Sequence, residues 1–320
     1  MTAPTLHHLA VPGPAAQHGG PRRVAWWEWN QTGTAHPSQL IVCVHGLSRQ
    51  ARDFDVLAGA LSRHARVVSV DVAGRGQSDW LADPAAYQIP TYAADLAVLL
   101  AHWRSRHAMA TGLADPDALR IDWVGTSMGG LIGMVLAAQP AMGLRKLVLN
   151  DVGPVIEPVS LQRIGAYLGV ERVFASEDEA ADALWSISRS FGPHTRAQWV
   201  ALSRPMLRPV SGGWALHYDP GIAVPFRALL AAGLTDEARQ AAHAGEQWLW
   251  QLYDAIQAQT LLIRGADSDL LTRATALAMT QRGPQARLVE FAGVGHAPTL
   301  VADDQVAAVC DFLLDGACLN

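Results

Sequence analysis

Gly125-Thr126-Ser127-Met128-Gly129 is the stretch that decides the fold of this 320-residue chain. The apolar run 121–124 precedes it and the helix-compatible run 131–138 follows it, so the pattern predicts a strand, a sharp turn and a helix. A turn this tight brings two backbones together, and a Cβ at either flanking glycine would collide. The arrangement is typical of a turn that presents a nucleophilic serine, here Ser127.

The partners that such a serine needs follow downstream, first an acid and then a histidine. The apolar strand candidate 260–265 ends in glycine, and Asp267 and Asp269 lie in the loop after it. The next strand candidate leads into His296, in a short loop flanked by glycine. Because the carboxyl ends of parallel strands meet at one edge of a sheet, we expect these side chains to lie near Ser127.

Donors for a developing oxyanion are also present. The strand candidate 40–44 ends in His45-Gly46-Leu47, which faces the serine turn in the expected sheet. Acyl transfer needs two preorganised N–H groups, and we expect those of Leu47 and Met128. His45 is expected to be structural, since His296 already supplies the imidazole.

These motifs together resemble the alpha/beta hydrolase superfamily, and more narrowly the bacterial serine hydrolases with a helical cap. The resemblance covers about residues 40–300 and includes the segments 71–78 and 149–154. Such relatives include carboxylesterases, enol-lactonases, carbon–carbon bond hydrolases and hydroxyacid-oligomer hydrolases. The resemblance implies an α/β fold with a mostly parallel, eight-stranded, doubly wound sheet and a helical cap inserted after strand 6.

Three carboxylates compete for the place beside His296: Asp267 and Asp269 after the seventh strand, and Asp151 after the sixth. Relatives with Gly-x-x-Ser-Asp followed by apolar residues point to Asp269, which precedes Leu270. Some family members recruit their acid at the place of Asp151, but a carboxylate leading into a cap is readily used to bond backbone N–H groups in a turn. We therefore expect Asp269 as the acid, with Asp267 and Asp151 as alternatives.

The spacing of apolar runs predicts the domain organisation. Two opening strands are expected to form a hairpin at the sheet edge, and six strands follow. The interval 152–245 breaks this rhythm and contains helical patterns, so we expect a core in two parts, 1–151 and 246–320, with the cap between them. The predicted strands are 6–11, 22–29, 40–45, 66–71, 120–126, 146–151, 260–265 and 286–291.

Composition narrows the partners and the compartment. The net charge of -5, the pI near 6.2 and the lack of a basic block argue against nucleic acid. No apolar run reaches the roughly 18 residues of a membrane span, and no export signal is evident. Three cysteines, Cys43, Cys310 and Cys318, cannot form a complete disulfide framework, which favours a reducing cytoplasm.

The expected activity is that of a serine hydrolase that cleaves carboxylic esters of small or medium soluble substrates through an acyl-enzyme. This chemistry needs no metal or other cofactor. Relatives among dehalogenases and epoxide hydrolases have an aspartate at the position of Ser127, so both activities are disfavoured. The alternatives are a carbon–carbon bond hydrolase or lactonase on the same scaffold and, in another class, a ligand-sensing receptor with slow turnover.

Overall fold

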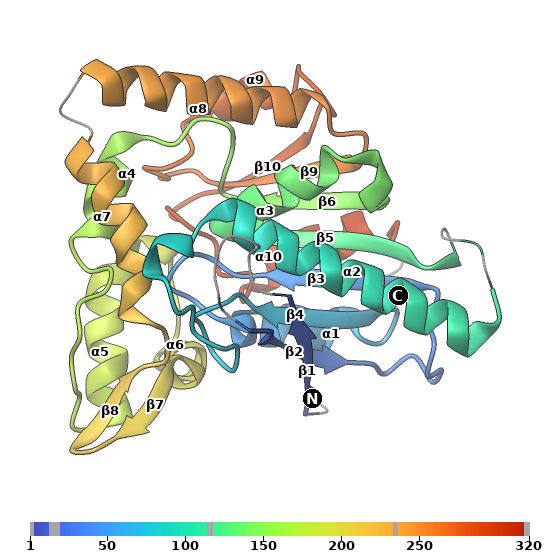
Figure 1. Ribbon diagram of the computed structural model, residues 1–320, viewed down its shortest axis with the longest axis horizontal. Coiled ribbons are helices and arrows are strands. Elements are labelled where there is room, and N and C mark those ends of the chain that lie inside the picture. The colour runs from blue at the N-terminus through green and yellow to red at the C-terminus, as the bar shows by residue number, and fades with distance from the viewer. Residues whose placement is uncertain (1–2, 13–19, 114, 116–117, 233–235, 317–320) are drawn as a thin grey trace.

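One eight-stranded sheet organises the molecule (Figure 1). The computed structural model describes residues 3–12, 20–113, 115, 118–232 and 236–316. The strand order is β1-β2-β4-β3-β5-β6-β9-β10, and every neighbouring pair from β4 to β10 is parallel. The strands are β1 Thr5–Val11, β2 Arg22–Trp29, β3 Gln39–Val44, β4 Arg66–Asp71, β5 Arg120–Thr126, β6 Leu144–Asn150, β9 Gln259–Gly265 and β10 Arg287–Phe291.

The two opening strands form the expected hairpin at one edge of the sheet. β1 pairs antiparallel with β2, and β2 pairs antiparallel with β4, so the antiparallel pairings of this sheet are confined to that edge. The central strands are buried along almost their whole length, as strands covered on both faces must be. The expectation of a mostly parallel, eight-stranded sheet is confirmed.

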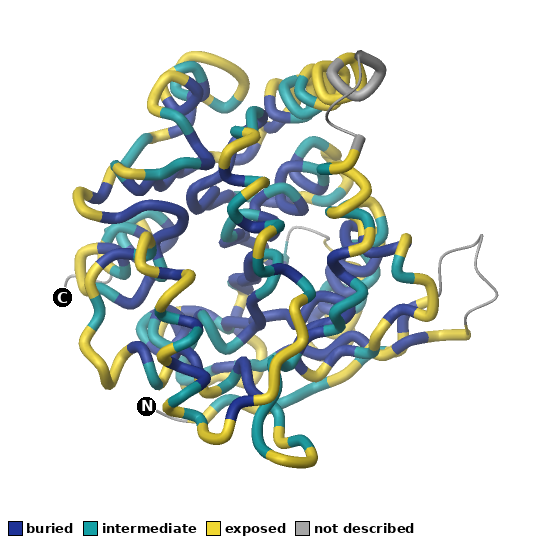
Figure 2. Tube along the Cα trace, turned by 90° about the vertical axis from the view of Figure 1, so that its left-hand side faces the viewer, coloured by how far each residue is buried: buried dark blue, intermediate teal, exposed yellow. Residues whose placement is uncertain are grey.

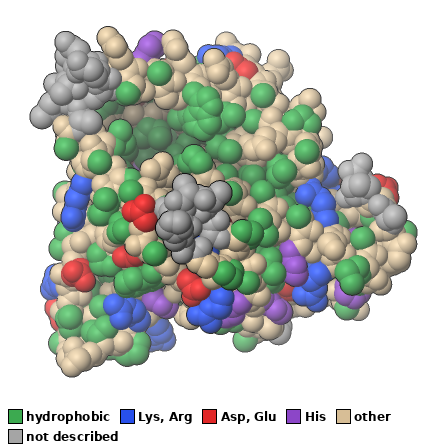
Figure 3. Space-filling model, viewed as in Figure 1, with side chains coloured by type: hydrophobic (Ala, Val, Ile, Leu, Met, Phe, Trp, Pro, Cys, Tyr) green, Lys and Arg blue, Asp and Glu red, His purple; other side chains and the backbone are tan. Residues whose placement is uncertain are grey.

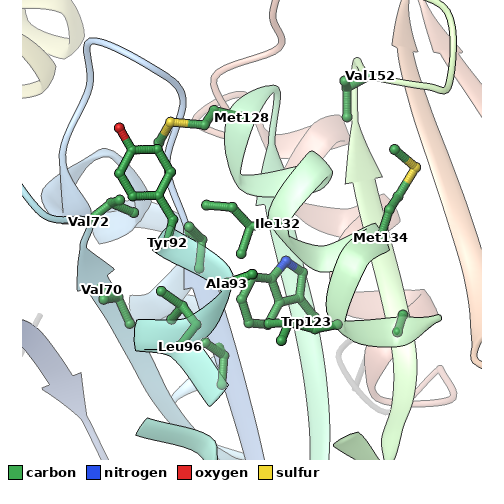
Figure 4. Close-up of a cluster of buried hydrophobic side chains, with 14 of the residues drawn as sticks. Val70, Val72, Tyr92, Ala93, Leu96, Trp123, Met128, Ile132, Met134 and Val152 are labelled. Carbon is green, nitrogen blue, oxygen red and sulfur yellow. The ribbon is translucent and has the colours of Figure 1, made fainter. Parts of the chain in front are cut away.

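Helices cover both faces of the sheet. Successive side chains of each strand point to opposite sides, so the buried strands present apolar side chains on both faces. On β3, Val42 and Val44 belong to the core beneath one helical layer, whereas Ile41 and Cys43 belong to the core beneath the other. Figure 4 shows part of the first core, where Trp123 of β5 lies near Ile132. The first layer contains α2 Ile89–Thr111, α3 Met128–Ala137 and α9 Arg273–Met279, and the second contains α1 Asp55–Leu61 and α10 Asp303–Leu313.

A long insertion separates β6 from β9, as expected for a cap. Its helices are α4 Pro158–Gly165, α5 Glu177–Ser188, α6 Arg196–Ser203, α7 Ala223–Ala232 and α8 Asp236–Asp254. α8 continues unbroken through residue 245, where we had expected the cap to end. In Figure 2, which faces the insertion, exposed segments lie toward the viewer and buried segments lie among them.

The insertion also holds a small hairpin that the sequence pattern did not predict. β7 Leu207–Val210 pairs antiparallel with β8 Gly213–Leu216. Phe174 and Trp214 exchange backbone hydrogen bonds of 2.8 Å in both directions, which fixes the hairpin against the start of the α5 segment. A four-residue strand that contains proline gives little periodic signal, so the hairpin could not be read from the pattern.

Apolar surface is concentrated on the insertion. On the face seen in Figure 3, hydrophobic side chains gather around a hollow below α8. Several large apolar residues of the insertion are exposed, among them Val159, Val173, Leu229 and Trp248.

Cys43 is buried in β3, and Cys318 lies outside the described residues.

Candidate active site

Ser127 occupies the sharp turn between β5 and α3. β5 ends at Thr126 and α3 begins at Met128, so a single residue makes the connection. Its backbone has a φ of 51° and a ψ of -113°, a conformation that costs free energy in any residue with a Cβ. Strain of this kind gathers at functional sites, where the surrounding structure holds it in place.

Two glycines give this turn its clearance, as the sequence predicted. A Cβ on Gly125 would lie 2.3 Å from the carbonyl oxygen of Gly129, and a Cβ on Gly129 would lie 2.0 Å from that of Val44. Atoms that are not bonded to each other do not approach this closely, even in a densely packed protein interior. Any larger residue would therefore force α3 away from β3 and β5, and the serine with it.

His296 lies in the loop after β10, and its ring is held by a carboxylate. Its Nδ1 donates a hydrogen bond of 2.8 Å to Oδ2 of Asp151. Both side chains are buried, with exposed fractions of 8% for the histidine and 0% for the aspartate. The bond leaves Nε2 as the ring nitrogen that can accept a proton.

Asp151 directly follows β6 and is fixed by three further contacts. Its Oδ1 accepts a hydrogen bond from the N–H of Gly265 at 2.8 Å, and its Oδ2 accepts one from the Ser268 hydroxyl at 2.6 Å. Its own N–H donates to Ile263 at 2.8 Å. The residue has a positive φ of 55°, which turns its side chain back over the ends of the strands.

The acid that we expected beside His296 therefore has to be corrected. Asp269 instead forms a two-pronged ion pair with Arg163, at 2.6 Å to Nε and 2.7 Å to Nη2. Partial burial raises the pKa of Asp269, but hydrogen bonds and the charge of Arg163 outweigh this and leave it below the usual range. Asp267 is exposed, and its N–H bonds to Val294.

Strand order explains this outcome. β6 and β9 are neighbours in the sheet, so the loops that follow them reach His296 from adjacent positions. Spacing along the chain cannot separate two such loops. The Gly-x-x-Ser-Asp pattern does contribute to the site, but through Ser268, which bonds Asp151, and not through Asp269.

Ser127 and His296 line the same cavity. Most of its other walls are apolar and come both from the sheet edge and from the insertion. Apolar walls lower the local dielectric constant and so strengthen the electrostatic interactions inside a cavity. The remaining lining residues are Gly46, Leu47, Ser48, Arg49, Asp53, Phe54, Thr126, Arg163, Ile164, Tyr167, Leu184, Ile187, Ser188, Phe191, Leu202, Met206, Ala297, Pro298 and Thr299.

The two residues expected to donate to the oxyanion are linked by a buried arginine that the sequence pattern did not indicate. Leu47 lines the cavity, and Met128 begins α3. Arg75 is fully buried, donates to the Leu47 carbonyl at 2.9 Å and lies 3.7 Å from the Met128 sulfur. Arg75 also donates to the hydroxyl of Tyr92 at 2.9 Å, and Figure 4 shows the Met128 side chain directed toward Tyr92.

His45 has the structural position that we expected. Its Nδ1 donates to the carbonyl of Gly46 at 2.7 Å, and its Nε2 accepts from the N–H of Val72 at 3.0 Å. Burial, together with the charges of Arg75 and Arg49, lowers its pKa to about 3, against the hydrogen bond to Gly46. His45 is thus a neutral ring that joins the ends of β3 and β4.

The insertion contacts the histidine loop directly. Ser190 accepts a hydrogen bond from the N–H of Gly295 through its carbonyl, and its hydroxyl donates to the carbonyl of His296 at 3.2 Å. A Cβ on Gly295 would lie 3.1 Å from the Ser190 side chain. The position of His296 therefore depends on the insertion as well as on the sheet.

The described residues contain neither a candidate metal site nor a candidate membrane span. Among them, no group of three or more His, Cys, Asp or Glu side chains could hold a metal ion. No helix within the described ranges is long and apolar enough to cross a membrane.

Comparisons with known proteins agree with this fold. A family model described as the alpha/beta hydrolase family matches residues 41–309. The chain is 44% identical over 314 residues to a 3-hydroxybutyrate-oligomer hydrolase of Cupriavidus necator, which covers 97% of this chain and 98% of that protein.

Solved structures extend the comparison. An alpha/beta hydrolase from Novosphingobium aromaticivorans superimposes with a TM-score of 0.77 at 33% identity, covering 98% of this chain and 99% of the other. E-2-(acetamidomethylene)succinate hydrolase has a TM-score of 0.71 at 20% identity, with 96% and 99% coverage, and shares the fold.

Proposed function

Because this chain belongs to the alpha/beta hydrolase family, we propose that it is a serine hydrolase that cleaves carboxylic esters of small or medium soluble substrates. Ser127 is the nucleophile, His296 the general base and Asp151 the acid that orients the histidine. The observation that carries this proposal is the buried hydrogen bond of 2.8 Å between His296 and Asp151. His296 lines the same cavity as Ser127, whose backbone is strained.

The first half-reaction follows from the groups in place. Nε2 of His296 takes the proton from the Ser127 hydroxyl as its oxygen attacks the acyl carbon of the ester. The imidazolium that forms is stabilised by Asp151, which also holds the ring in the tautomer with hydrogen on Nδ1. The N–H groups of Leu47 and Met128 donate to the oxyanion of the tetrahedral intermediate.

The imidazolium then gives its proton to the leaving alcohol, which ends the first half-reaction and leaves the acyl group as an ester of Ser127. The second half-reaction reuses the same atoms. His296 takes a proton from water as the water oxygen attacks the acyl carbon. The bond between that carbon and the Ser127 oxygen then breaks, the imidazolium returns its proton to the Ser127 oxygen, and the acid leaves. Each bond made and broken is accounted for by Ser127, His296 and one water molecule.

We assign the cap to residues 152–258, which extends the interval expected from the sequence to the end of the insertion before β9. The cap supplies the apolar side of the cavity through residues such as Ile164, Leu184 and Phe191. A wall of this kind excludes water from the acyl-enzyme and selects the acyl or alcohol group.

Hydroxyacid oligomers are the substrates that we favour within the ester class. The relative of Cupriavidus necator bears the name of 3-hydroxybutyrate-oligomer hydrolase and matches this chain along nearly its full length. Such oligomers carry short, methyl-branched units joined by ester bonds, which suits an apolar cavity of this lining.

Replacing the nucleophile tests the proposed function. Ser127→Ala is expected to lower kcat for p-nitrophenyl butyrate by on the order of a million-fold, because the attacking hydroxyl is removed. The variant should keep the circular dichroism spectrum and the melting temperature of the wild type. Retention of a tenth of the activity in purified protein would sink the assignment, and a wild type that turns over no ester of a panel would favour a receptor.

A further inference from the structure

The two arginines in the cavity wall differ in where their carboxylate partners lie. Arg49 and Asp53 both line the cavity and form a two-pronged ion pair of 2.6 and 2.8 Å, so this part of the wall is neutral. Arg163 of α4 also lines the cavity, whereas its partner Asp269 does not. Asp269 offsets the charge of Arg163, but only the arginine of this pair forms part of the wall.

The guanidinium of Arg163 has hydrogen-bond donors that Asp269 does not use. Asp269 takes one hydrogen from Nε and one from Nη2, at 2.6 and 2.7 Å. A guanidinium carries five N–H donors, and Tyr167 forms a further side-chain hydrogen bond with Arg163, which leaves two donors for another acceptor. Its side chain is about one-third exposed, and Ile164 and Tyr167 of the same chain segment line the cavity with it.

We propose that Arg163 binds the free carboxylate of the substrate, which makes anionic hydroxyacid esters the preferred substrate class. This inference rests on the proposed ester hydrolysis. An oligomer of hydroxyacids ends in one carboxylate, and a charge-assisted hydrogen bond to a guanidinium at an apolar wall is stronger than one between neutral groups. The distance from Arg163 to Ser127 then decides which ester bond, counted from the carboxyl end, is cleaved.

Asp269 is a positioning residue in this account. It fixes the plane of the guanidinium from outside the cavity and ties α4 of the cap to the loop after β9. The ion pair holds the Arg163 side chain in one rotamer, so less rotamer freedom is lost when a carboxylate binds.

Two probes with one ester bond each test the proposal: the 3-hydroxybutyrate dimer, and the same dimer with its terminal carboxylate replaced by a carboxamide. The wild type is expected to have a kcat/KM roughly 10- to 100-fold higher for the acid than for the amide, the range for a hydrogen bond to a charged group. In Arg163→Gln this preference should collapse, mainly through a higher KM for the acid. Activity on the amide should stay within about threefold, as for a neutral pair.

Matched variants separate recognition from structure. Arg163→Lys should restore part of the preference, and Asp269→Asn should reduce it less than Arg163→Gln does. Arg172→Gln removes an exposed cap arginine paired with Glu179 and should leave both probes unchanged. Equal rates of the wild type on the two probes, or an equal loss on both in Arg163→Gln, would overturn the proposal.

The wild-type comparison needs no variant, so it stands even where Arg163→Gln fails to fold. Failure of the proposed function is distinguished by p-nitrophenyl butyrate, which is neutral. If the wild type hydrolyses that ester through Ser127 but does not prefer the acid dimer, the hydrolase assignment survives and the role of Arg163 is wrong.

Discussion

Asp151 holds three parts of this site together through one carboxylate. Its carboxylate bonds the ring of His296, the N–H of Gly265 and the hydroxyl of Ser268, all within 2.8 Å. A serine nucleophile needs the imidazole in one tautomer and one orientation, and this carboxylate can supply both.

The identity of the acid gives the first prediction. Asp151→Asn is expected to lower kcat by about four orders of magnitude, because an amide presents the wrong hydrogen-bonding partner to Nδ1 of His296. Asp269→Asn is expected to change kcat for a neutral ester by less than about tenfold, since its partner is Arg163. Steady-state kinetics with p-nitrophenyl butyrate compare the two. The reverse ranking would return the acid to Asp269.

His45 gives a prediction about stability at acid pH. Burial holds its pKa at about 3 in the folded protein, whereas the unfolded chain takes up this proton near pH 6.5. Between these values only the unfolded state is protonated at His45. The folded state therefore loses stability as pH falls, by up to about 1.4 kcal/mol per pH unit.

The measurement for His45 is a difference between two proteins. Burial raises the pKa of Asp71 to about 6, so this carboxyl binds a proton first in the folded state and acts in the opposite direction. The free energy of unfolding of wild type and of His45→Gln should be followed by urea from pH 7 to 4. The variant should show a smaller loss toward pH 4, and parallel curves would contradict the assignment.

At the scale of elements, the turn between β5 and α3 depends on contact between backbones. Gly129→Ala is expected to lower the free energy of unfolding by about 3 kcal/mol or more, because its Cβ would meet the Val44 carbonyl at 2.0 Å. Gly245→Ala is the matched control. It lies exposed within α8 with nothing within 4 Å of its Cβ, and should raise the free energy of unfolding by about 0.5–1 kcal/mol.

Urea unfolding followed by circular dichroism measures both glycine variants. If Gly129→Ala unfolds at the same urea concentration as the wild type, the close approach of α3 to β3 is wrong. A loss of stability in Gly245→Ala would instead question the helical conformation of that part of α8.

At the scale of the whole molecule, strong apolar runs carried the prediction from sequence. All eight strands of the sheet, the opening hairpin and the interrupting insertion could be located, since each buried strand is a short apolar run bounded by polar or glycine residues. Ser127 and His296 could be placed because one lies at a glycine-flanked turn and the other follows the last strand.

What could not be predicted depends on contacts between distant segments. Choosing Asp151 over Asp269 requires knowing that Arg163 of the insertion pairs with Asp269, from which it is 106 residues apart in the chain. Arg75 is polar and lies in a glycine-rich loop, so nothing in its local pattern indicates that it is fully buried between Leu47 and Met128. The hairpin of β7 and β8 is too short for its periodicity to be read.

The most direct test of the account is covalent labelling of the nucleophile. A fluorophosphonate ester, which reacts with activated serines, should add one group to the wild type, and peptide mass spectrometry should place it on Ser127. Ser127→Ala should take up no label, and Asp151→Asn should react far more slowly than Asp269→Asn. No adduct on the wild type, or an adduct on another residue that persists in Ser127→Ala, would contradict the assignment of this protein as a serine hydrolase.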